Sequence, residues 1–177
     1  MAIETFQNEI FPDSAISVAL FESVANCNDL KKLAMTGELD ATLLNPSMIV
    51  DTFQILVACN KALHLDRCKK RVTRTLHSEV IYNLSPSKNI SDAFRKFGMG
   101  DKDTSVLLVQ IHSLRKGTLS EVAEHVQGEM VDLSRLQEVS DVNKIKKIYK
   151  VQEAELRVST LLDAIVSRMT SKEFVSF

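Results

Sequence analysis

The 177-residue sequence predicts an α/β fold of the α+β kind, in which helices pack on a mixed β-sheet around a long, buried central helix. Two patterns lead to this prediction. Segments in which apolar and polar residues alternate, as in strands, are interleaved with segments of helical period. From Phe53 to Cys59 every residue except Gln54 is apolar, and a helix that is apolar all round is normally a buried one.

The composition supports a single domain over residues 1–177. Hydrophobic residues make up 45% of the chain and charged residues 25%, which is ordinary globular usage. A chain of this size buries roughly 70% of its unfolded surface without disulfides. Residues 171–177 still carry Phe174, Val175 and Phe177, so we expect a tail that is either flexible or docked on the domain or a partner.

The individual elements follow from local signals. Alternating apolar residues over 16–21 predict a strand, and the apolar face of residues 28–35, followed by Gly37, predicts a short helix. Next come a strand over 79–84 that ends at Ser85-Pro86, a helix that is capped by Asn89 or Ser91 and ends at a left-handed Gly98, and a central strand over 105–111. A helix then runs from the capping box of Thr118 and Glu121 to Gln127, with Gly128 at its end, and a strand over 130–133 follows. The last two elements are a helix from Ser140 or Asp141 to Tyr149 and a helix over 158–169.

The long helix is predicted to begin at Asn45-Pro46. The Asn45 side chain can accept hydrogen bonds from the first backbone N–H groups of a helix, and Pro46 fits the first turn. We expect this helix to reach about Cys68, which corresponds to roughly 35 Å at ~1.5 Å per residue.

Sequence motifs of catalysis are absent. There is no glycine-rich phosphate loop, no nucleophile elbow and no cysteine pair with zinc spacing. His64 and Cys68 would share a helix face and supply half a metal site, but the sequence nominates no further ligand. We therefore predict no catalytic residue, no cofactor and no metal. As an alternative, Cys68 beside Lys69 and Lys70 has the cationic surroundings of a reactive thiol, which would make the protein an enzyme.

The cysteines and the hydropathy indicate an intracellular, water-soluble protein. The three cysteines have no regular spacing, which argues against a disulfide framework. No apolar stretch approaches the ~20 residues that cross a bilayer, and no signal peptide is visible. We expect no membrane partner.

A dense basic run follows the apolar helix, although the formal net charge of the chain is only -1. Its candidate RNA contacts are Arg67, Lys69, Lys70, Arg71 and Arg74. Each cation that neutralises a phosphate releases a counterion and gives salt-sensitive affinity. The other interpretation is a solvated helix end, where cations interact favourably with the helix dipole. An acidic stretch over 121–141 is either a second docking face or ordinary solvated surface.

Three blocks of residues form a specific combination. The first comprises Asn45-Pro46, Ile49-Val50-Asp51, Phe53-Gln54-Ile55-Leu56-Val57-Ala58 and Asn60-Lys61-Ala62. The second comprises Arg74-Thr75-Leu76, Glu79, Asn83-Leu84-Ser85-Pro86, Asn89-Ile90-Ser91, Ala93 and Phe97-Gly98. The third comprises Lys146-Lys147-Ile148-Tyr149-Lys150 and Thr160-Leu161-Leu162-Asp163-Ala164-Ile165. With these blocks, nearly the whole chain resembles the PRPK-binding protein family, the small kinase-binding subunit of the KEOPS complex, particularly in its animal form.

The resemblance implies a non-catalytic, allosteric accessory subunit of the cytoplasm and nucleus. Members of the family bind an atypical, PRPK-type kinase that acts as an ATPase, within a complex that installs the threonylcarbamoyl group on adenosine in tRNA. The synthase of that complex would be an indirect partner. Archaeal relatives grip the unpaired 3′ end of tRNA. The alternative function is therefore an RNA-binding module that recruits the tRNA 3′ end through the basic run.

For the kinase interface we expect an apolar patch made of Leu63, Leu65 and Val72 together with the C-terminal helix. These residues lie where the long helix leaves its most apolar segment, so part of their surface can remain uncovered. The alternative is that they complete the core of the domain itself.

Overall fold

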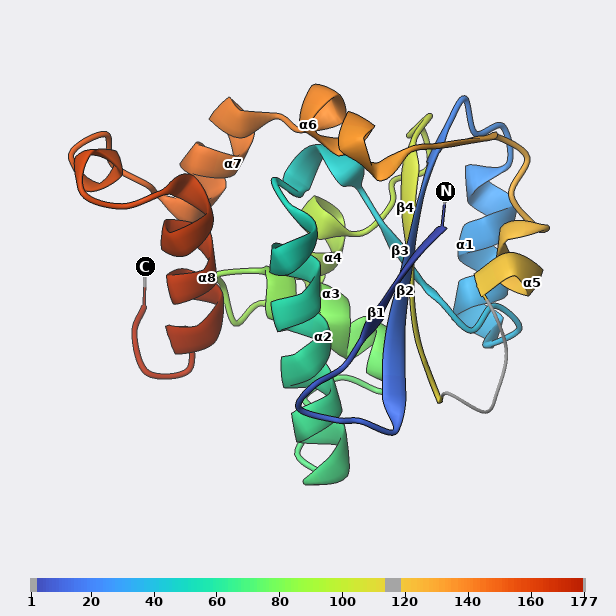
Figure 1. The fold of residues 1–177 in the computed structure, drawn as a ribbon, viewed down its shortest axis with the longest axis horizontal. Helices are drawn as coiled ribbons and strands as arrows, with labels where there is room; N and C mark the ends of the chain where they lie inside the picture. The colour runs from blue at the N-terminus through green and yellow to red at the C-terminus, as the bar shows by residue number, and fades with distance from the viewer. Residues whose placement is uncertain (1–2, 114–118, 177) are drawn as a thin grey trace. The chain divides into compact units, whose positions relative to one another are not determined.

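The computed structural model describes residues 3–113 and 119–176, and its contacts divide the chain into two compact units. Unit 1 comprises Met1–Pro46 and Gly98–Arg135, and unit 2 comprises Ser47–Phe97 and Leu136–Phe177. The strands lie in unit 1 and most of the helices lie in unit 2, which confirms the α+β class (Figure 1). That residues 1–177 act as a single domain stays a prediction.

Unit 1 is built on a five-stranded sheet of β1 (Ile3–Gln7), β2 (Ser14–Glu22), β3 (Thr42–Leu44), β4 (Val106–Ser113) and β5 (Glu129–Val131). The strand order is β1-β2-β4-β3. Strand β5 also pairs with β2, at residues 20–22, whereas β1 pairs with residues 15–19 of β2. The sheet is antiparallel in every described pairing, so the prediction of a mixed sheet is wrong. Strands β2 and β3 do run in the same direction, but β4 lies between them and is antiparallel to both.

The interior of unit 1 lies between this sheet and two helices, α1 (Cys27–Thr36) and α5 (Leu119–Ala123), as Figure 1 shows. The predicted strands over 16–21 and 105–111 are confirmed, and Val106–Ile111 is buried on both faces of β4. Helix α1 ends at Gly37, whose φ of 80° is a left-handed conformation that glycine adopts without steric cost. Helix α5 ends earlier than predicted, and Thr118 of its proposed capping box lies outside the described residues.

Unit 2 is helical, with α2 (Thr52–Arg67), α3 (Leu76–Leu84), α4 (Ile90–Phe97), α6 (Leu136–Val139), α7 (Val142–Tyr149) and α8 (Leu161–Ser171). Single turns of 3-10 helix occur at Pro46–Met48, Leu133–Arg135 and Glu155–Arg157. Helix α2 packs against α3 and α8 (Figure 1). Within the part of the chain that the structure describes, no helix is both long enough and apolar enough to span a membrane.

The long helix begins later than predicted. Asp51, not Asn45, is the N-cap of α2, and its carboxylate accepts a hydrogen bond of 2.8 Å from the backbone N–H of Phe53. Pro46 instead opens a separate 3-10 turn. An aspartate in extended conformation caps a helix as well as an asparagine does, so the sequence contained two competing start signals. The C-terminal end at Arg67 lies one residue from the predicted Cys68.

Residues 79–84 form part of helix α3 and not a strand, so that prediction is wrong. Thr75 and Ser78 form a capping box at the start of α3, with each side chain bonded to the other residue's backbone N–H. This cap favours a helix at the start of α3. The alternation over residues 79–84 is too short to identify a strand, because a run of six residues fits either element.

The remaining helix boundaries largely agree with the sequence. Asn89 caps α4 and Asp141 caps α7, as predicted. Gly98 does not have a left-handed backbone, because among the described glycines only Gly37 has a positive φ; it forms an isolated β-bridge with Leu44. The N-cap of α8 is Thr160, so this helix starts later than the predicted 158. The described tail ends at residue 176, and its flexibility stays a prediction.

Candidate functional site

Helix α2 is buried on one face only. Its inward residues are Gln54, Ile55, Ala58, Cys59, Ala62 and Leu63. The opposite face repeats at helical spacing and consists of Phe53, Leu56, Val57, Asn60, Lys61 and His64, all exposed or half-buried. The prediction of a helix buried all round is therefore wrong at one face, where the first half is apolar and the second half is polar.

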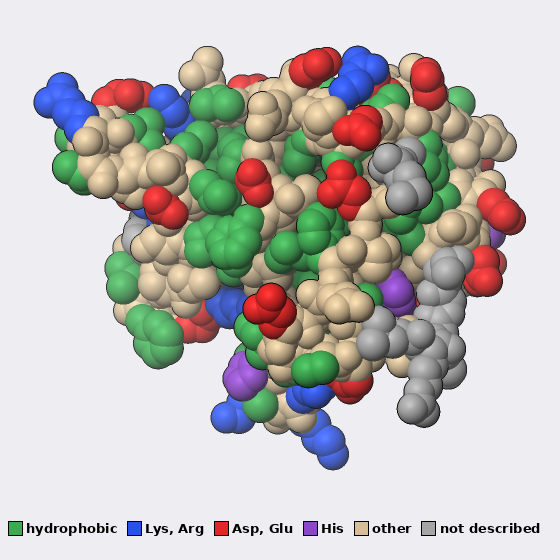
Figure 2. Space-filling model, viewed as in Figure 1, with side chains coloured by type: hydrophobic (Ala, Val, Ile, Leu, Met, Phe, Trp, Pro, Cys, Tyr) green, Lys and Arg blue, Asp and Glu red, His purple; other side chains and the backbone are tan. Residues whose placement is uncertain are grey.

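An apolar surface results where α2 meets α8. Phe53 is 51% exposed, and Leu56 and Val57 follow it one turn later, half-buried. Leu161 and Leu162 are half-buried on the first turn of α8, which packs beside α2. Figure 2 shows hydrophobic side chains gathered over the first turns of these two helices. We call Phe53, Leu56, Val57, Leu161 and Leu162 the apolar face.

A buried polar network supports the apolar face from below. Gln54 donates to the carbonyl of Met48 (3.3 Å) and to the hydroxyl of Tyr149 (3.2 Å), and it accepts from the backbone of Val50 (3.0 Å). The Tyr149 hydroxyl donates to the carbonyl of Leu84, and its burial raises its pKa. Because these groups are satisfied and enclosed, they fix the start of α2 relative to α3 and α7.

The opposite end of α2 closes in a tight turn. The backbone N–H of Lys70 donates to the carbonyl of Leu65 (2.8 Å) and that of Lys69 to Asp66 (3.0 Å). This is the Schellman arrangement, in which the residue after the cap is left-handed. That residue is Lys69, with a φ of 55°, where a glycine is the usual choice.

The five predicted RNA contacts lie at this turn and in the loop that follows it. Arg67, Lys69, Lys70 and Arg74 are exposed, and Figure 2 shows Lys and Arg side chains at this end of α2. Arg71 is half-buried and engaged, since its Nε lies 2.9 Å from Asp66 Oδ1 and its Nη1 donates to the carbonyl of Arg74 (2.9 Å). We call these five residues the basic cluster.

The buried carboxylate of Glu79 holds the loop that carries the basic cluster. It accepts hydrogen bonds from the backbone N–H groups of Val72 (3.1 Å) and Thr73 (2.8 Å) and from the Thr73 hydroxyl (2.6 Å). Glu79 has no exposed surface. Its charge is therefore balanced by the donors of the loop, and the loop is tied to α3.

The three residues of the predicted kinase patch have different surroundings. Leu63 is only 6% exposed and belongs to the interior of unit 2, as the alternative interpretation required. Leu65 is half-buried. Val72 is 53% exposed. Whether Leu65 and Val72 contact a kinase stays a prediction, but these residues do not form one continuous surface patch with Leu63.

The residues that the sequence interpretation missed are Phe53, Leu56 and Val57 on α2, whereas Leu161 and Leu162 belong to the C-terminal helix that it included. Their signal was available, since Phe53, Leu56 and Val57 are spaced like the polar residues Asn60, Lys61 and His64 that continue the same stripe. A solvent-facing stripe that is apolar in its first half is a feature of candidate interaction surfaces.

The thiols and histidines offer little chemistry. The Cys68 Sγ lies 3.9 Å from His64 Nε2 on the exposed end of α2. Burial raises the pKa of Cys59 and of Cys27, whose thiol donates to the carbonyl of Asp103. Among residues 3–113 and 119–176, no three His, Cys, Asp or Glu side chains are placed to hold a metal ion.

Comparison with known proteins gives consistent matches. Residues 21–173 match the family described as "Kinase binding protein CGI-121". The chain is 45% identical over 166 residues to the EKC/KEOPS complex subunit TPRKB of Danio rerio, an alignment that covers 93% of this chain and 95% of that protein. It is 32% identical to the EKC/KEOPS complex subunits cgi121 of Aspergillus fumigatus, over 85% of each chain, and of Schizosaccharomyces pombe, over 90% of this chain and 96% of that protein.

Proposed function

The chain belongs to the CGI-121 family of kinase-binding proteins, and from this membership we propose that it is a non-catalytic accessory subunit of an EKC/KEOPS complex, where it binds the kinase of that complex. Its relatives are named as subunits of this complex in a fish and in fungi. A PRPK-type kinase that acts as an ATPase is the proposed direct partner, and the synthase an indirect one. The proposed role is support of threonylcarbamoyl-adenosine formation on tRNA, in the cytoplasm and nucleus.

The apolar face is the proposed docking surface for the kinase. The observation that carries this assignment is the exposure of Phe53 beside Leu56, Val57 and the first turn of α8. Exposed aromatic residues set among smaller apolar ones are typical anchors of protein interfaces. The polar network under this surface holds it in place before binding, which lowers the entropic cost of association.

Substitution of Phe53 by glutamate tests this assignment directly. We expect Phe53→Glu to weaken kinase binding by about 30-fold or more, since burying an aromatic anchor is worth ~2 kcal/mol or more. Val72→Glu is the matched control, because Val72 is equally exposed but lies at the other end of α2. Binding is measured by titration calorimetry with the purified kinase, and thermal unfolding of each variant shows that the fold is intact.

The outcomes separate the hypotheses. If Val72→Glu rather than Phe53→Glu loses binding, the docking surface is the one expected from the sequence. If the unmodified protein does not bind the kinase at all, the proposed function is wrong. An ATPase assay of the kinase with and without this subunit and tRNA then measures regulation. Full activity of Cys68→Ser in the reconstituted complex would exclude the thiol enzyme.

A second candidate function, recruitment of the tRNA 3′ end, is favoured by the basic cluster. Arg67, Lys69 and Lys70 are exposed at the end of α2 and Arg74 is exposed in the loop that follows, which gives a concentrated positive field. We propose that this cluster contacts RNA phosphates. The slope of log affinity against log salt concentration should fall by about one for each cation replaced by glutamine.

The test uses tRNA with and without its unpaired 3′ end. Loss of affinity on removal of that end, together with loss on replacing Lys69 and Lys70, supports recruitment of the end through this cluster. Equal, weak binding of both RNAs would reject it.

A further inference from the structure

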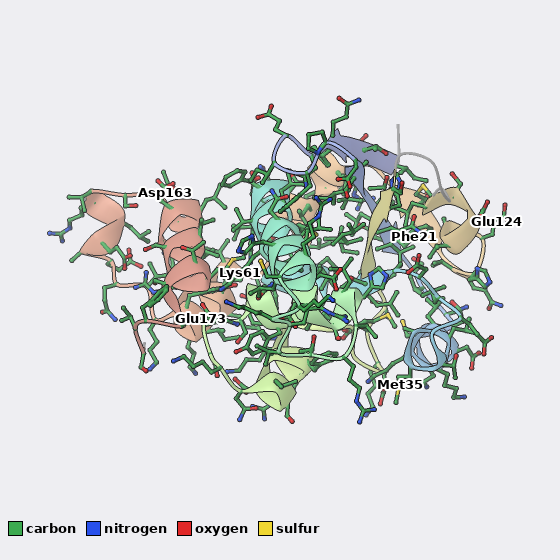
Figure 3. All side chains as sticks on the ribbon, turned by 90° about the horizontal axis from the view of Figure 1, so that it is seen from below. Phe21, Met35, Lys61, Glu124, Asp163 and Glu173 are labelled. Atoms are coloured by element: carbon green, nitrogen blue, oxygen red, sulfur yellow. The ribbon has the colours of Figure 1, made fainter. Side chains whose placement is uncertain are left out.

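The segment that joins α7 to α8 adds no side chain to the interior of unit 2. Residues 152–160 are all exposed or half-buried, and their middle is the 3-10 turn Glu155–Arg157. In Figure 3 this segment is the ribbon at the far left, next to Asp163 in the first turn of α8. A segment without buried apolar contacts opens easily unless polar contacts hold it.

Arg168 on α8 provides such contacts. Its guanidinium forms two parallel hydrogen bonds with the Glu155 carboxylate, from Nη1 to Oε1 (2.7 Å) and from Nη2 to Oε2 (2.8 Å). It also donates to the carbonyls of Ala164 (3.1 Å) and Lys150 (3.3 Å). A bidentate pair fixes orientation as well as distance, and the hydrogen bonds from Arg168 lower the pKa of Glu155. Arg168 therefore ties the turn both to α8 and to the residue that ends α7.

The turn that is held in this way displays an aliphatic and a cationic side chain. Val158 is 88% exposed, and Arg157 is exposed beside it. Within the described ranges Arg157 has no ion-pair partner, whereas the neighbouring acid, Glu155, is engaged by Arg168. The displayed pair is therefore apolar and positive. An arginine next to an apolar anchor is a frequent composition of protein interfaces.

The turn is continuous with the apolar face. Val158 precedes Leu161 by three residues, so their Cα atoms lie within ~11 Å of each other. Thr160 fixes the junction, since it is the N-cap of α8 and its hydroxyl accepts from the backbone N–H of Asp163 (3.1 Å). Asp163 itself has a local role, because the helix dipole favours a negative charge in the first turn. One exposed valine would be ordinary surface, but a valine next to Leu161 and Leu162 enlarges an existing apolar surface.

We propose that residues 155–158 are a docking turn for the kinase, with Val158 entering an apolar pocket and Arg157 pairing with a carboxylate beside that pocket. Arg168 is the positioning residue of this turn. The assignment rests on the proposed function, because the turn extends the apolar face. A standard interface covers about 800 Å² of each partner, which is enough for a kinase seated on Leu161 to reach Val158 as well. A turn that is fixed before binding loses little entropy on association.

The first test examines the positioning role in the free protein. Trypsin binds its substrates in an extended conformation, so it cleaves the Arg157–Val158 bond only when the turn opens. We expect Arg168→Met to raise the rate of this cleavage by about fivefold or more, because the turn loses its bidentate contact. Cleavage after Lys147, within α7, reports general unfolding and should not rise. Arg95→Met, which breaks an exposed ion pair on α4, is the control variant. An unchanged rate in Arg168→Met would overturn the positioning role.

The second test adds the purified kinase at a concentration that saturates the unmodified protein. The docking turn predicts that cleavage of the Arg157–Val158 bond, followed by mass spectrometry, slows by about fivefold or more. Kinase binding without protection of this bond would reject the docking turn and leave the proposed function intact. Absence of kinase binding would reject the proposed function and, with it, the kinase as the occupant of the turn.

Substitutions then test the two displayed side chains. Val158→Asp should weaken kinase binding by about tenfold in titration calorimetry, since it places a charge against an apolar pocket. Val142→Asp is the matched control, because Val142 is 42% exposed at the start of α7, and its affinity should not change. Arg157→Gln should lower the salt dependence of the association rate. Unchanged affinity in Val158→Asp would overturn the docking turn, and unchanged salt dependence in Arg157→Gln would overturn the pairing with a carboxylate.

A double-mutant cycle separates positioning from general destabilisation. If Arg168 acts through the turn, Arg168→Met weakens kinase binding less in the Val158→Asp background than in the unmodified protein. Equal losses in both backgrounds would show that Arg168 contributes to stability and not to docking.

Discussion

Each end of α2 is anchored by a buried polar group, but the group is neutral at one end and a carboxylate at the other. At the first turn, the neutral groups of Gln54 and Tyr149 tie the helix to its neighbours, and the surface above them is apolar. At the last turn, the buried carboxylate of Glu79 ties down the following loop, and the surface is cationic. The difference teaches that a single helix can present two surfaces with separate physical requirements. The proposed docking at the apolar end would depend on desolvation, whereas the proposed docking at the basic end would depend on salt.

Removal of the Glu79 carboxylate, which holds the loop at the basic end of α2, should destabilise the protein most. Glu79→Ala leaves the backbone donors of Val72 and Thr73 without their acceptor, and we expect a loss of about 3 kcal/mol in the free energy of unfolding. Urea denaturation measures it. Glu79→Gln keeps one acceptor oxygen and should lose about half as much. A loss below about 0.5 kcal/mol for Glu79→Ala would show that water replaces the carboxylate.

Removal of the Tyr149 hydroxyl, which belongs to the network at the apolar end of α2, should destabilise the protein less. Tyr149→Phe removes the hydroxyl that accepts from the Gln54 amide and donates to the carbonyl of Leu84, at an expected cost of about 2 kcal/mol. Tyr82→Phe is the control, because its ring keeps the contact with Lys172, and it should change stability by under about 0.5 kcal/mol. Equal losses for the two variants would mean that the network does not contribute specifically.

The cap at the start of α2 is expected to matter less than the network. Asp51→Ala removes the acceptor of the Phe53 N–H and should cost about 1 kcal/mol in chemical denaturation. Asp51→Asn retains a capping oxygen and should be nearly neutral. If both variants lose the same amount, charge at the helix start and not capping is responsible.

The smallest expected effect is a gain at the other end of α2. Lys69 has a left-handed backbone, so Lys69→Gly should stabilise the protein by about 0.5–1 kcal/mol, measured as a rise in the denaturation midpoint. Lys70→Gly, at the next position, relieves no such strain and should not stabilise. A loss of stability in Lys69→Gly would show that the side chain contributes more than the strain costs.

Much of the fold was readable from the sequence where one signal dominated. The alternation over 16–21, the apolar run over 105–111 and the cap at Asp141 all gave correct elements. Residues 79–84 were misassigned because two of the buried positions of α3, Glu79 and Asn83, are polar. Their side chains bond to backbone groups distant in sequence or in the preceding loop, which no local pattern reveals.

The candidate site was predicted in part. The residues of the basic cluster are neighbours in sequence, and they lie at the end of α2 and in the loop that follows it. The apolar face joins residues more than a hundred positions apart, and it includes Phe53 from a segment that looked like pure core. Apolar composition alone does not separate a residue packed inside its own unit from one that is covered by a partner. The contact of Arg168 with the turn at Glu155 likewise depends on tertiary packing.

The three cysteines, all in the described ranges, differ in exposure, so the unmodified protein can be labelled with a dye at one of them. Cys27 and Cys59 are buried, and burial raises their pKa, whereas Cys68 is exposed one residue past the end of α2. A maleimide dye applied near neutral pH should therefore attach at one position without any substitution. That dye would sit on the turn beside the basic cluster and opposite the apolar face along α2. Its emission would distinguish ligands that arrive at one end of the helix from those that arrive at the other.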